Sequence, residues 1–183
     1  MTKTWFISDT HFGHSKTTDG SFKRADGTNL RPFKDADEMD FEMMRRWNER
    51  VDHKDRVYHL GDVVIARKNL WKLSQLNGRK ALVRGNHDVF HTEDYIKIGF
   101  DEIYGVKVLS DMILSHIPLH PRCVTDRFNV NVHGHLHAND MEDGRYLNVS
   151  VEHIDYTPIT IEEVRARVEE KRKKYPIILS RDG

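Results

Sequence analysis

The chain carries five short groups of polar residues whose side chains can bind a metal ion or move a proton. The groups are Asp9-Thr10-His11, Gly61-Asp62, Gly85-Asn86-His87-Asp88, His116 and Gly134-His135-Leu136-His137. Each group follows a short apolar run, and such runs, bounded by Gly, Asp or Asn, are typical of buried strands. In open α/β sheets, ligands bind beyond the carboxyl ends of the strands. We therefore expect five strand ends to bring these side chains to one rim of the fold.

The spacing within the groups favours metal binding. Asp9 and His11 are two positions apart, so in an extended stretch their side chains lie on the same face and can reach one ion. Asp62 and Asn86 each follow a glycine, where the backbone can turn sharply and come close to a metal. A carboxylate that can bridge, further oxygen ligands and neutral imidazoles suit two divalent ions that keep excess positive charge for a phosphate. The predicted ligands are Asp9, His11, Asp62, Asn86, His116, His135 and His137.

At these residues the sequence resembles the calcineurin-like metallophosphoesterases, and most of all their small members without a cap domain. The pattern of that superfamily is Asp-x-His, Gly-Asp, Gly-Asn-His followed by Asp or Glu, a lone His, and Gly-His-x-His. All five motifs occur here in that order, between residues 9 and 137. Gly13-His14, Arg31-Pro32-Phe33 and the stretch 148–152 also look similar to the small phosphoesterases.

The resemblance implies a role for each motif residue. One metal would take Asp9, His11 and His137, the other would take Asn86, His116 and His135, and Asp62 would bridge them. His87 would be the general acid, with Asp88 orienting it. Two-metal chemistry then predicts attack of a metal-bound hydroxide on a phosphate ester. An imidazole suits proton donation to the leaving oxygen because it exchanges protons near neutral pH.

The elements that must position these residues are alternating strands and helices in the first part of the chain and successive short strands in the second part. We expect strands over residues 4–8, 56–60, 80–83, 103–109, 112–115, 128–132 and 145–149, and helices over residues 35–51, 69–76, 91–98 and 160–174. A run of βα units followed by strands predicts two sheets packed face to face with helices outside. The resemblance likewise implies an α/β fold, a four-layer α/β/β/α sandwich of two mixed sheets, with the metal site at the carboxyl ends of the strands. No repeat or linker interrupts residues 1–183, so a single domain is expected.

Several residues near the motifs have two interpretations. His14 either touches the scissile phosphate or caps a turn, and Arg31 is either a phosphate clamp or a solvated residue of the long loop 12–34. His133 is expected to pack beneath the metals or to hydrogen-bond a ligand, and His59 to be a satisfied core residue. The run Lys171-Arg172-Lys173-Lys174 is either a nucleic-acid patch or a set of cations that favours the dipole at a helix end.

The amino-acid composition says more about the compartment and the cofactors of the protein than about its substrate. The 29 basic and 29 acidic residues balance, so overall charge favours no polyanionic partner, whereas twelve histidines suit metal chemistry. Cys123 is the sole cysteine and no apolar stretch is long enough to span a membrane, which predicts a cytoplasmic protein. Oxygen and imidazole ligands without thiolate are compatible with manganese, iron, zinc, nickel or magnesium, and we expect manganese.

The sequence therefore predicts a hydrolase that uses two divalent metal ions. A phosphodiester substrate is favoured over a phosphomonoester because little of the chain is left for a cap domain and the cleft should be open. A small molecule such as a nucleotide or a cyclic nucleotide fits that expectation, and no obligate protein partner is evident. The alternatives are a nuclease acting on polymeric nucleic acid and a non-enzymatic metal-binding scaffold.

Overall fold

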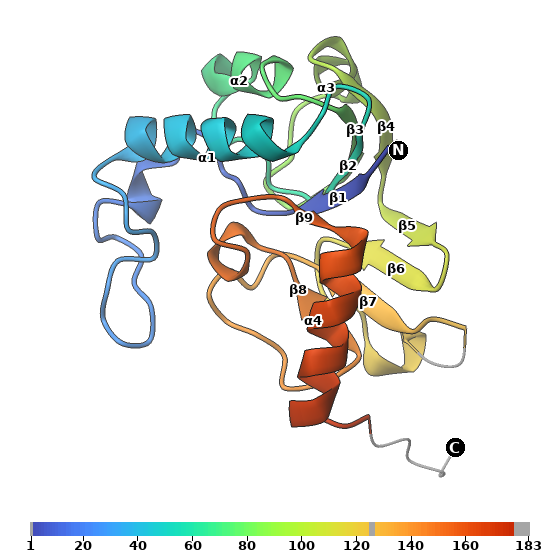
Figure 1. Cartoon of the computed structure of the whole chain (residues 1–183). Helices are drawn as coiled ribbons and strands as arrows, with labels where there is room; N and C mark the ends of the chain where they lie inside the picture. Colours follow the sequence, from blue (N-terminus) through green and yellow to red (C-terminus); the bar gives the residue numbers. More distant parts are fainter. Residues whose placement is uncertain (1, 125–126, 178–183) are drawn as a thin grey trace.

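Two β-sheets form the centre of the computed structural model, which describes residues 2–124 and 127–177 (Figure 1). The first sheet has the strand order β4-β3-β2-β1-β9. Its strands are β1 (Thr4–Ile7), β2 (Arg56–His59), β3 (Arg79–Val83), β4 (Phe100–Tyr104) and β9 (Ile159–Thr160). The first four are parallel, and β9 pairs antiparallel with β1, so the sheet is mixed.

The second sheet has the order β5-β6-β7-β8 and is also mixed. Its strands are β5 (Val106–Leu109), β6 (Met112–Ser115), β7 (Val130–His133) and β8 (Tyr146–Asn148). The last three are parallel and β5 is antiparallel to β6. Two mixed sheets flanked by helices confirm the predicted fold class.

Helices cover the sheets from outside (Figure 1). They are α1 (Ala36–Arg50), α2 (Trp71–Ser74), α3 (Thr92–Lys97) and α4 (Ile161–Lys174). The first three lie on the side of the first sheet, whereas α4 contacts β8 as well as β9 and β1, so it spans both sheets. Asp35 caps α1 and Thr160 opens α4 with a capping box, as the sequence predicted.

An apolar stripe on α1 is buried. Met39, Met43, Trp47 and Val51 recur at every fourth position and are each almost fully buried in the main core. Among the described residues, no helix combines the length and the apolar composition needed to cross a membrane.

Some element boundaries differ from the prediction. The strand expected over residues 103–109 is two strands, because the chain leaves the first sheet after β4, turns at Gly105 and enters the second sheet as β5. The helix expected over residues 69–76 is a 3-10 turn, Arg67–Asn69, followed by α2. The two-residue strand β9 was not predicted, since it is too short to show an alternating pattern.

The two sheets meet at the carboxyl ends of β1 and β8. The amide of Ser8 donates to the carbonyl of Val149 over 3.0 Å, and the amide of Val151 donates to the carbonyl of Ser8 over 3.1 Å. This junction brings the turn after β1 next to the turns after β7 and β8. Residues from both halves of the chain therefore share one rim.

Candidate dinuclear metal site

Left-handed backbone conformations mark the turns at this rim. Of the eight non-glycine residues with positive φ in the described chain, five are predicted metal ligands: Asp9, His11, Asp62, His135 and His137, with φ between 46° and 68°. A non-glycine residue rarely adopts this conformation, which costs on the order of 1 kcal/mol or more, and such residues cluster at functional sites. The surrounding structure therefore holds these residues in a backbone conformation that is unfavourable by itself.

Two glycines let the turns approach one another. A Cβ atom on Gly85 would lie 2.2 Å from Asp62 Oδ1, and one on Gly134 would lie 2.3 Å from Asp9 Oδ2 and 2.0 Å from Ser8 Oγ. Neither position has room for a side chain. The glycines of the third and fifth sequence motifs are thus explained by the close approach of the turns.

The predicted ligands converge in two clusters. In each cluster the candidate ligand atoms all lie within 4.8 Å of one another; the clusters are Asp9, His11 and His137, and Asp62, His116 and His135. Asp62 Oδ2 lies between the clusters, 3.5 Å from His11 Nε2 and 3.4 Å from His116 Nε2. Asn86 Oδ1 lies 3.0 Å from His116 Nε2. All seven predicted ligands therefore surround one small region.

Buried atoms without partners show that the donor set suits metal ions. Asp9 Oδ2 accepts hydrogen bonds from the His135 amide and from Ser150 Oγ, each over 2.9 Å, whereas Asp9 Oδ1 is buried without a partner. Both ring nitrogens of His11 are also buried without a partner, and Nε2 lies 3.8 Å from Asp9 Oδ1. Two atoms that bind one ion at about 2.0–2.2 Å lie roughly this far apart. A divalent ion would satisfy Asp9 Oδ1 and one ring nitrogen of His11, so the residues fit the predicted metals.

The histidine pKa values follow from burial and neighbouring charge. Burial and the nearby Arg31 guanidinium hold the pKa of His11 well below its usual range, which keeps the imidazole in the neutral form that binds metals. Burial also opposes protonation of His116, but the hydrogen bond and charge of Asp62 and the charge of Asp9 outweigh it and raise the pKa of His116 to about 9. Asp62 thus favours a positive charge at the second cluster.

Arg31 supports the site from inside the protein. Its guanidinium donates to the carbonyl of Thr10 over 2.8 Å and to that of Asp9 over 2.5 Å, and its Nε donates to Glu152 Oε1 over 2.8 Å. The Arg31 side chain is 0% exposed. The expectation that Arg31 is a phosphate clamp or a solvated loop residue is therefore wrong, because it has no surface to offer to substrate or solvent.

Glu152 connects this buried cation to a predicted ligand. Its Oε1 also lies 3.2 Å from His137 Nδ1, which leaves His137 Nε2 for a metal. Burial alone would raise the pKa of Glu152, but Arg31 and His137 lower it to about 2, so the side chain is a carboxylate. Arg31, Glu152 and His137 thus form a chain from the long loop to the first cluster.

Asp88 does not orient the His87 ring as expected. Its two oxygens accept hydrogen bonds from three backbone amides, those of Asp62 over 2.8 Å, Val63 over 3.0 Å and Gly85 over 2.8 Å. Asp88 therefore connects the turn after β2 to the turn after β3, and both of its carboxylate oxygens accept hydrogen bonds from backbone amides. Its contribution to the site is the position of Asp62.

Comparison with known proteins agrees with this geometry. The profile of the calcineurin-like phosphoesterase family matches residues 2–179. The chain belongs to this family. A relative in Methanocaldococcus jannaschii, the uncharacterized protein MJ1445, is 32% identical over 185 residues, which cover 92% of this chain and 93% of that protein. The gene 66 protein of Mycobacterium phage L5 is 33% identical over 96 residues, covering 50% of this chain and 42% of that protein.

One solved structure has a similar fold over most of the chain. It is AQ665 from Aquifex aeolicus, a protein of unknown function, with a TM-score of 0.66 and 26% sequence identity. The match covers 91% of this chain and 100% of that chain.

The two remaining histidines of interest lie beside the site. The half-buried His14 has its ring centroid 5.5 Å from that of His11 and 5.7 Å from that of Phe22, and its Nδ1 has no partner among the described residues. Its contact with a substrate stays a prediction. His133 is fully buried, and its Nδ1 lies 2.8 Å from the Gly134 carbonyl oxygen, beneath the rim.

The sequence reasoning missed the residues that fix Asp9 and His137. Ser150 and Glu152 follow β8 at a spacing of two, as Asp9 and His11 follow β1, so the same pattern could have found them. Both residues lie in the stretch 148–152, whose similarity to the small phosphoesterases was read from the sequence without a role for either of them. Both act on ligands through hydrogen bonds rather than by binding a metal.

Proposed function

We propose that this chain is a dinuclear metal-dependent phosphoesterase that hydrolyses a phosphodiester. The observation that carries the proposal is the position of Asp62 Oδ2, which lies 3.5 Å from a nitrogen of His11 and 3.4 Å from a nitrogen of His116. One carboxylate oxygen shared by two clusters of ligands is the arrangement that two adjacent ions need.

The proposed ligands divide between the two ions as the clusters do. One ion would be held by Asp9, His11 and His137, the other by Asn86, His116 and His135, and Asp62 would bridge them. Two divalent ions bound there would acidify a water molecule and neutralise the oxygens of a phosphate ester. All seven side chains are oxygen or imidazole donors and none is a thiolate, a set that is compatible with manganese, iron, zinc, nickel or magnesium. Manganese is the proposed metal.

His87 is the proposed general acid. Its backbone amide donates to Asp62 Oδ1 over 2.8 Å, and its ring lies edge-on to His11 with 5.5 Å between the ring centroids. The residue is exposed, so an imidazole held beside the clusters can meet a substrate from solvent and give a proton to the leaving oxygen. Asp88 contributes through the backbone that carries both Asp62 and His87.

The cellular location, the domain organisation and the substrate of the enzyme are proposed from the sequence. A cytoplasmic enzyme with one domain over residues 1–183 agrees with a chain whose only cysteine, Cys123, is free. The proposed substrate is a small phosphodiester such as a nucleotide or a cyclic nucleotide.

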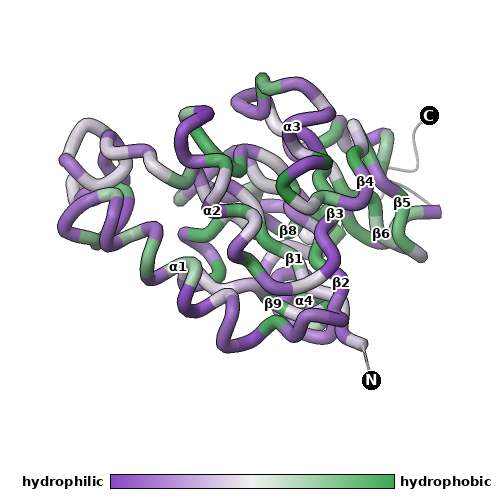
Figure 2. Tube along the Cα trace, turned by 90° about the horizontal axis from the view of Figure 1, so that it is seen from above, coloured by the Kyte–Doolittle hydropathy of each residue, from purple (hydrophilic) through white to green (hydrophobic). Residues whose placement is uncertain are grey.

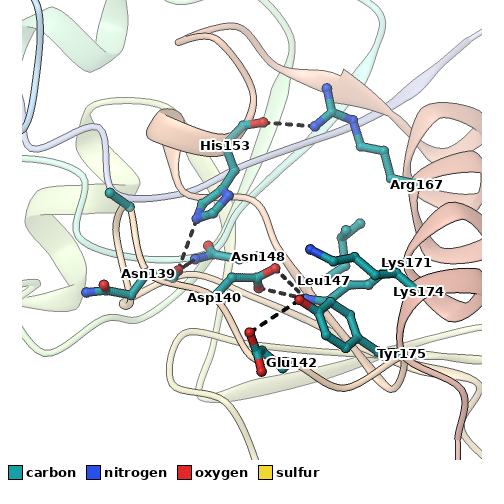
Figure 3. A pocket seen from close by; sticks show the side chains of 11 residues that line it. Asn139, Asp140, Glu142, Leu147, Asn148, His153, Arg167, Lys171, Lys174 and Tyr175 are labelled. Carbon is teal, nitrogen blue, oxygen red and sulfur yellow. Dashed lines mark hydrogen bonds and ion pairs between the residues drawn. The ribbon is translucent and has the colours of Figure 1, made fainter. Parts of the chain in front are cut away.

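The basic run at the end of α4 favours a small substrate over polymeric nucleic acid. Lys171 pairs with Asp140 over 2.7 Å, Arg172 with Glu169 over 3.3 Å and Lys173 with Glu170 over 3.5 Å. Figure 3 shows Lys171 and Lys174 in a pocket of about 510 Å³, where acidic Asp140 and Glu142 face them. These carboxylates offset the positive charge that a phosphate backbone would need.

The test is turnover by metal-stripped protein refilled with manganese, measured on an aryl phosphodiester and an aryl phosphomonoester in parallel. We expect faster diester turnover, which Asp62→Ala and His87→Ala abolish. His53→Ala is the matched control, because His53 is an exposed histidine in the turn before β2, at the amino end of that strand, whereas the metal clusters lie at the carboxyl ends. Lack of turnover of either ester with two bound metals per chain would reject the proposal and favour a scaffold, and a monoester preference would reject the diester assignment.

A further inference from the structure

A small apolar pocket opens directly beside the second cluster. It has a volume of about 320 Å³ and lies between the turn after β3 and the facing ends of β5 and β6. Two of its lining residues, Asn86 and His116, are proposed ligands of the second ion. A phosphate held between the two clusters therefore has one of its ester substituents at the mouth of this pocket.

The rest of the lining is mainly apolar. Val106 is 47% exposed and Ile117 is 52% exposed, and Leu119 completes the wall. In Figure 2, much of β5 and β6, whose facing ends lie at the pocket, is coloured as hydrophobic. Partly exposed aliphatic side chains gathered around a pocket gain free energy when a ligand covers them.

Arg84, the one arginine or lysine in the lining, is engaged elsewhere. Arg84 donates a hydrogen bond to the carbonyl of Phe90, and its guanidinium lies over the ring of Tyr95, 5.6 Å from the ring centroid. This distinguishes the pocket from the larger one beside α4, whose lining includes Arg167, Lys171 and Lys174 (Figure 3). The pocket beside His116 thus suits an uncharged group rather than a further phosphate.

We infer that this pocket is a specificity subsite for an apolar, ring-sized ester group of the phosphate substrate. The inference rests on the proposed function, because it takes the phosphate to lie between the two metal clusters. The volume of about 320 Å³ is at the lower end of small-molecule sites, which is enough for one ring and too small for a macromolecular segment. Val106 and Ile117 cover the ring, while the ion that Asn86 and His116 would hold binds the phosphate end.

The first experiment measures binding without turnover. Phenylphosphonate and methylphosphonate carry a P–C bond that the enzyme cannot hydrolyse, and their Kd values for zinc-loaded protein are compared by calorimetry. We expect phenylphosphonate to bind about tenfold more tightly, because its ring buries apolar surface in the pocket. Ile117→Asn should weaken phenylphosphonate about fivefold and Val106→Thr about threefold, while both leave methylphosphonate unchanged.

Val108→Thr is the matched control. Val108 is also on β5 and is 43% exposed, but it does not line the pocket, so its replacement should change neither Kd. Equal affinity for the two phosphonates in the wild type, or equal effects of Val106→Thr and Val108→Thr, would overturn the inference.

A second experiment separates this inference from the proposed function. Wild-type turnover is compared for two phosphodiesters that share the same aryl leaving group, one with phenyl and the other with methyl as the second ester group. Hydrolysis of both without a phenyl preference would refute the subsite and leave the proposed function intact. A phenylphosphonate preference that Ile117→Asn removes, in a protein that hydrolyses no ester, would support the subsite and refute the proposed function.

Discussion

Replacing Glu152 tests how the first metal cluster is held. Its Oε1 lies 2.8 Å from Arg31 Nε and 3.2 Å from His137 Nδ1, and both Arg31 and Glu152 have side chains that are 0% exposed. Removing the carboxylate would leave the Arg31 guanidinium buried without its counter-charge. Breaking a buried ion pair in this way costs about 3–5 kcal/mol of the free energy of unfolding.

The same change should weaken metal binding. Arg31 also holds the carbonyls of Asp9 and Thr10, so its displacement would loosen the turn that carries Asp9. Loss of a hydrogen-bond partner behind a metal-binding histidine typically costs about 10–100-fold in metal affinity. We therefore expect Glu152→Ala to lose stability and metal affinity together.

The assay uses urea unfolding of the metal-stripped protein and a separate manganese titration. Glu152→Gln keeps an oxygen that His137 can donate to but removes the charge, so it should lose stability while losing less metal affinity than Glu152→Ala. Glu170→Gln is the control, because Glu170 pairs with Lys173 over 3.5 Å on the exposed face of α4 and should change neither quantity. Unchanged metal affinity in Glu152→Ala, with the stability lost, would refute the link between this pair and His137.

Three further predictions concern the core and the turns. Burial lowers the pKa of His59 to about 3, so only the unfolded chain takes up this proton below the usual value of 6.5, and the free energy of unfolding should fall by up to about 1.4 kcal/mol per pH unit from 6.5 toward 3. Urea unfolding at pH 7.5 and pH 5 should show a smaller drop in His59→Gln; an equal drop would assign the pH dependence to other groups. Gly85→Ala would bring a Cβ within 2.2 Å of Asp62 Oδ1 and should reduce bound metal by elemental analysis, whereas Gly105→Ala, with nothing within 4 Å, should retain it. Asp88→Asn would place an amide NH₂ against backbone N–H donors and should lower thermal stability and kcat. The pH profile of kcat should stay unchanged. A shifted profile would show that Asp88 acts directly on the His87 ring.

The sequence predicted the clusters because each motif is local. A strand, a sharp turn and two polar residues occupy only a few positions, so Asp9 with His11 and His135 with His137 could be placed on the rim before the fold was known. Parallel strands then bring their carboxyl ends together whatever the details of the loops. The apolar stripe of α1 was predictable for the same reason, since its period lies within one helix.

The missing parts of the prediction depend on contacts between distant residues. Arg31 and Glu152 are 121 positions apart, and nothing local distinguishes a buried arginine from a solvated one in a polar loop. Asp88 lies next to His87 in sequence but bonds to amides 25 and 26 positions earlier, so adjacency suggested the wrong partner. The change of sheet at Gly105 depends on how β5 pairs with β6, which apolar composition alone does not reveal.

Anomalous diffraction from crystals of the manganese-loaded protein tests the central claim most directly. The account predicts two anomalous peaks per chain on either side of Asp62 Oδ2. One would be bounded by Asp9, His11 and His137, and the other by Asn86, His116 and His135. A single peak, or two peaks that do not share Asp62, would contradict it.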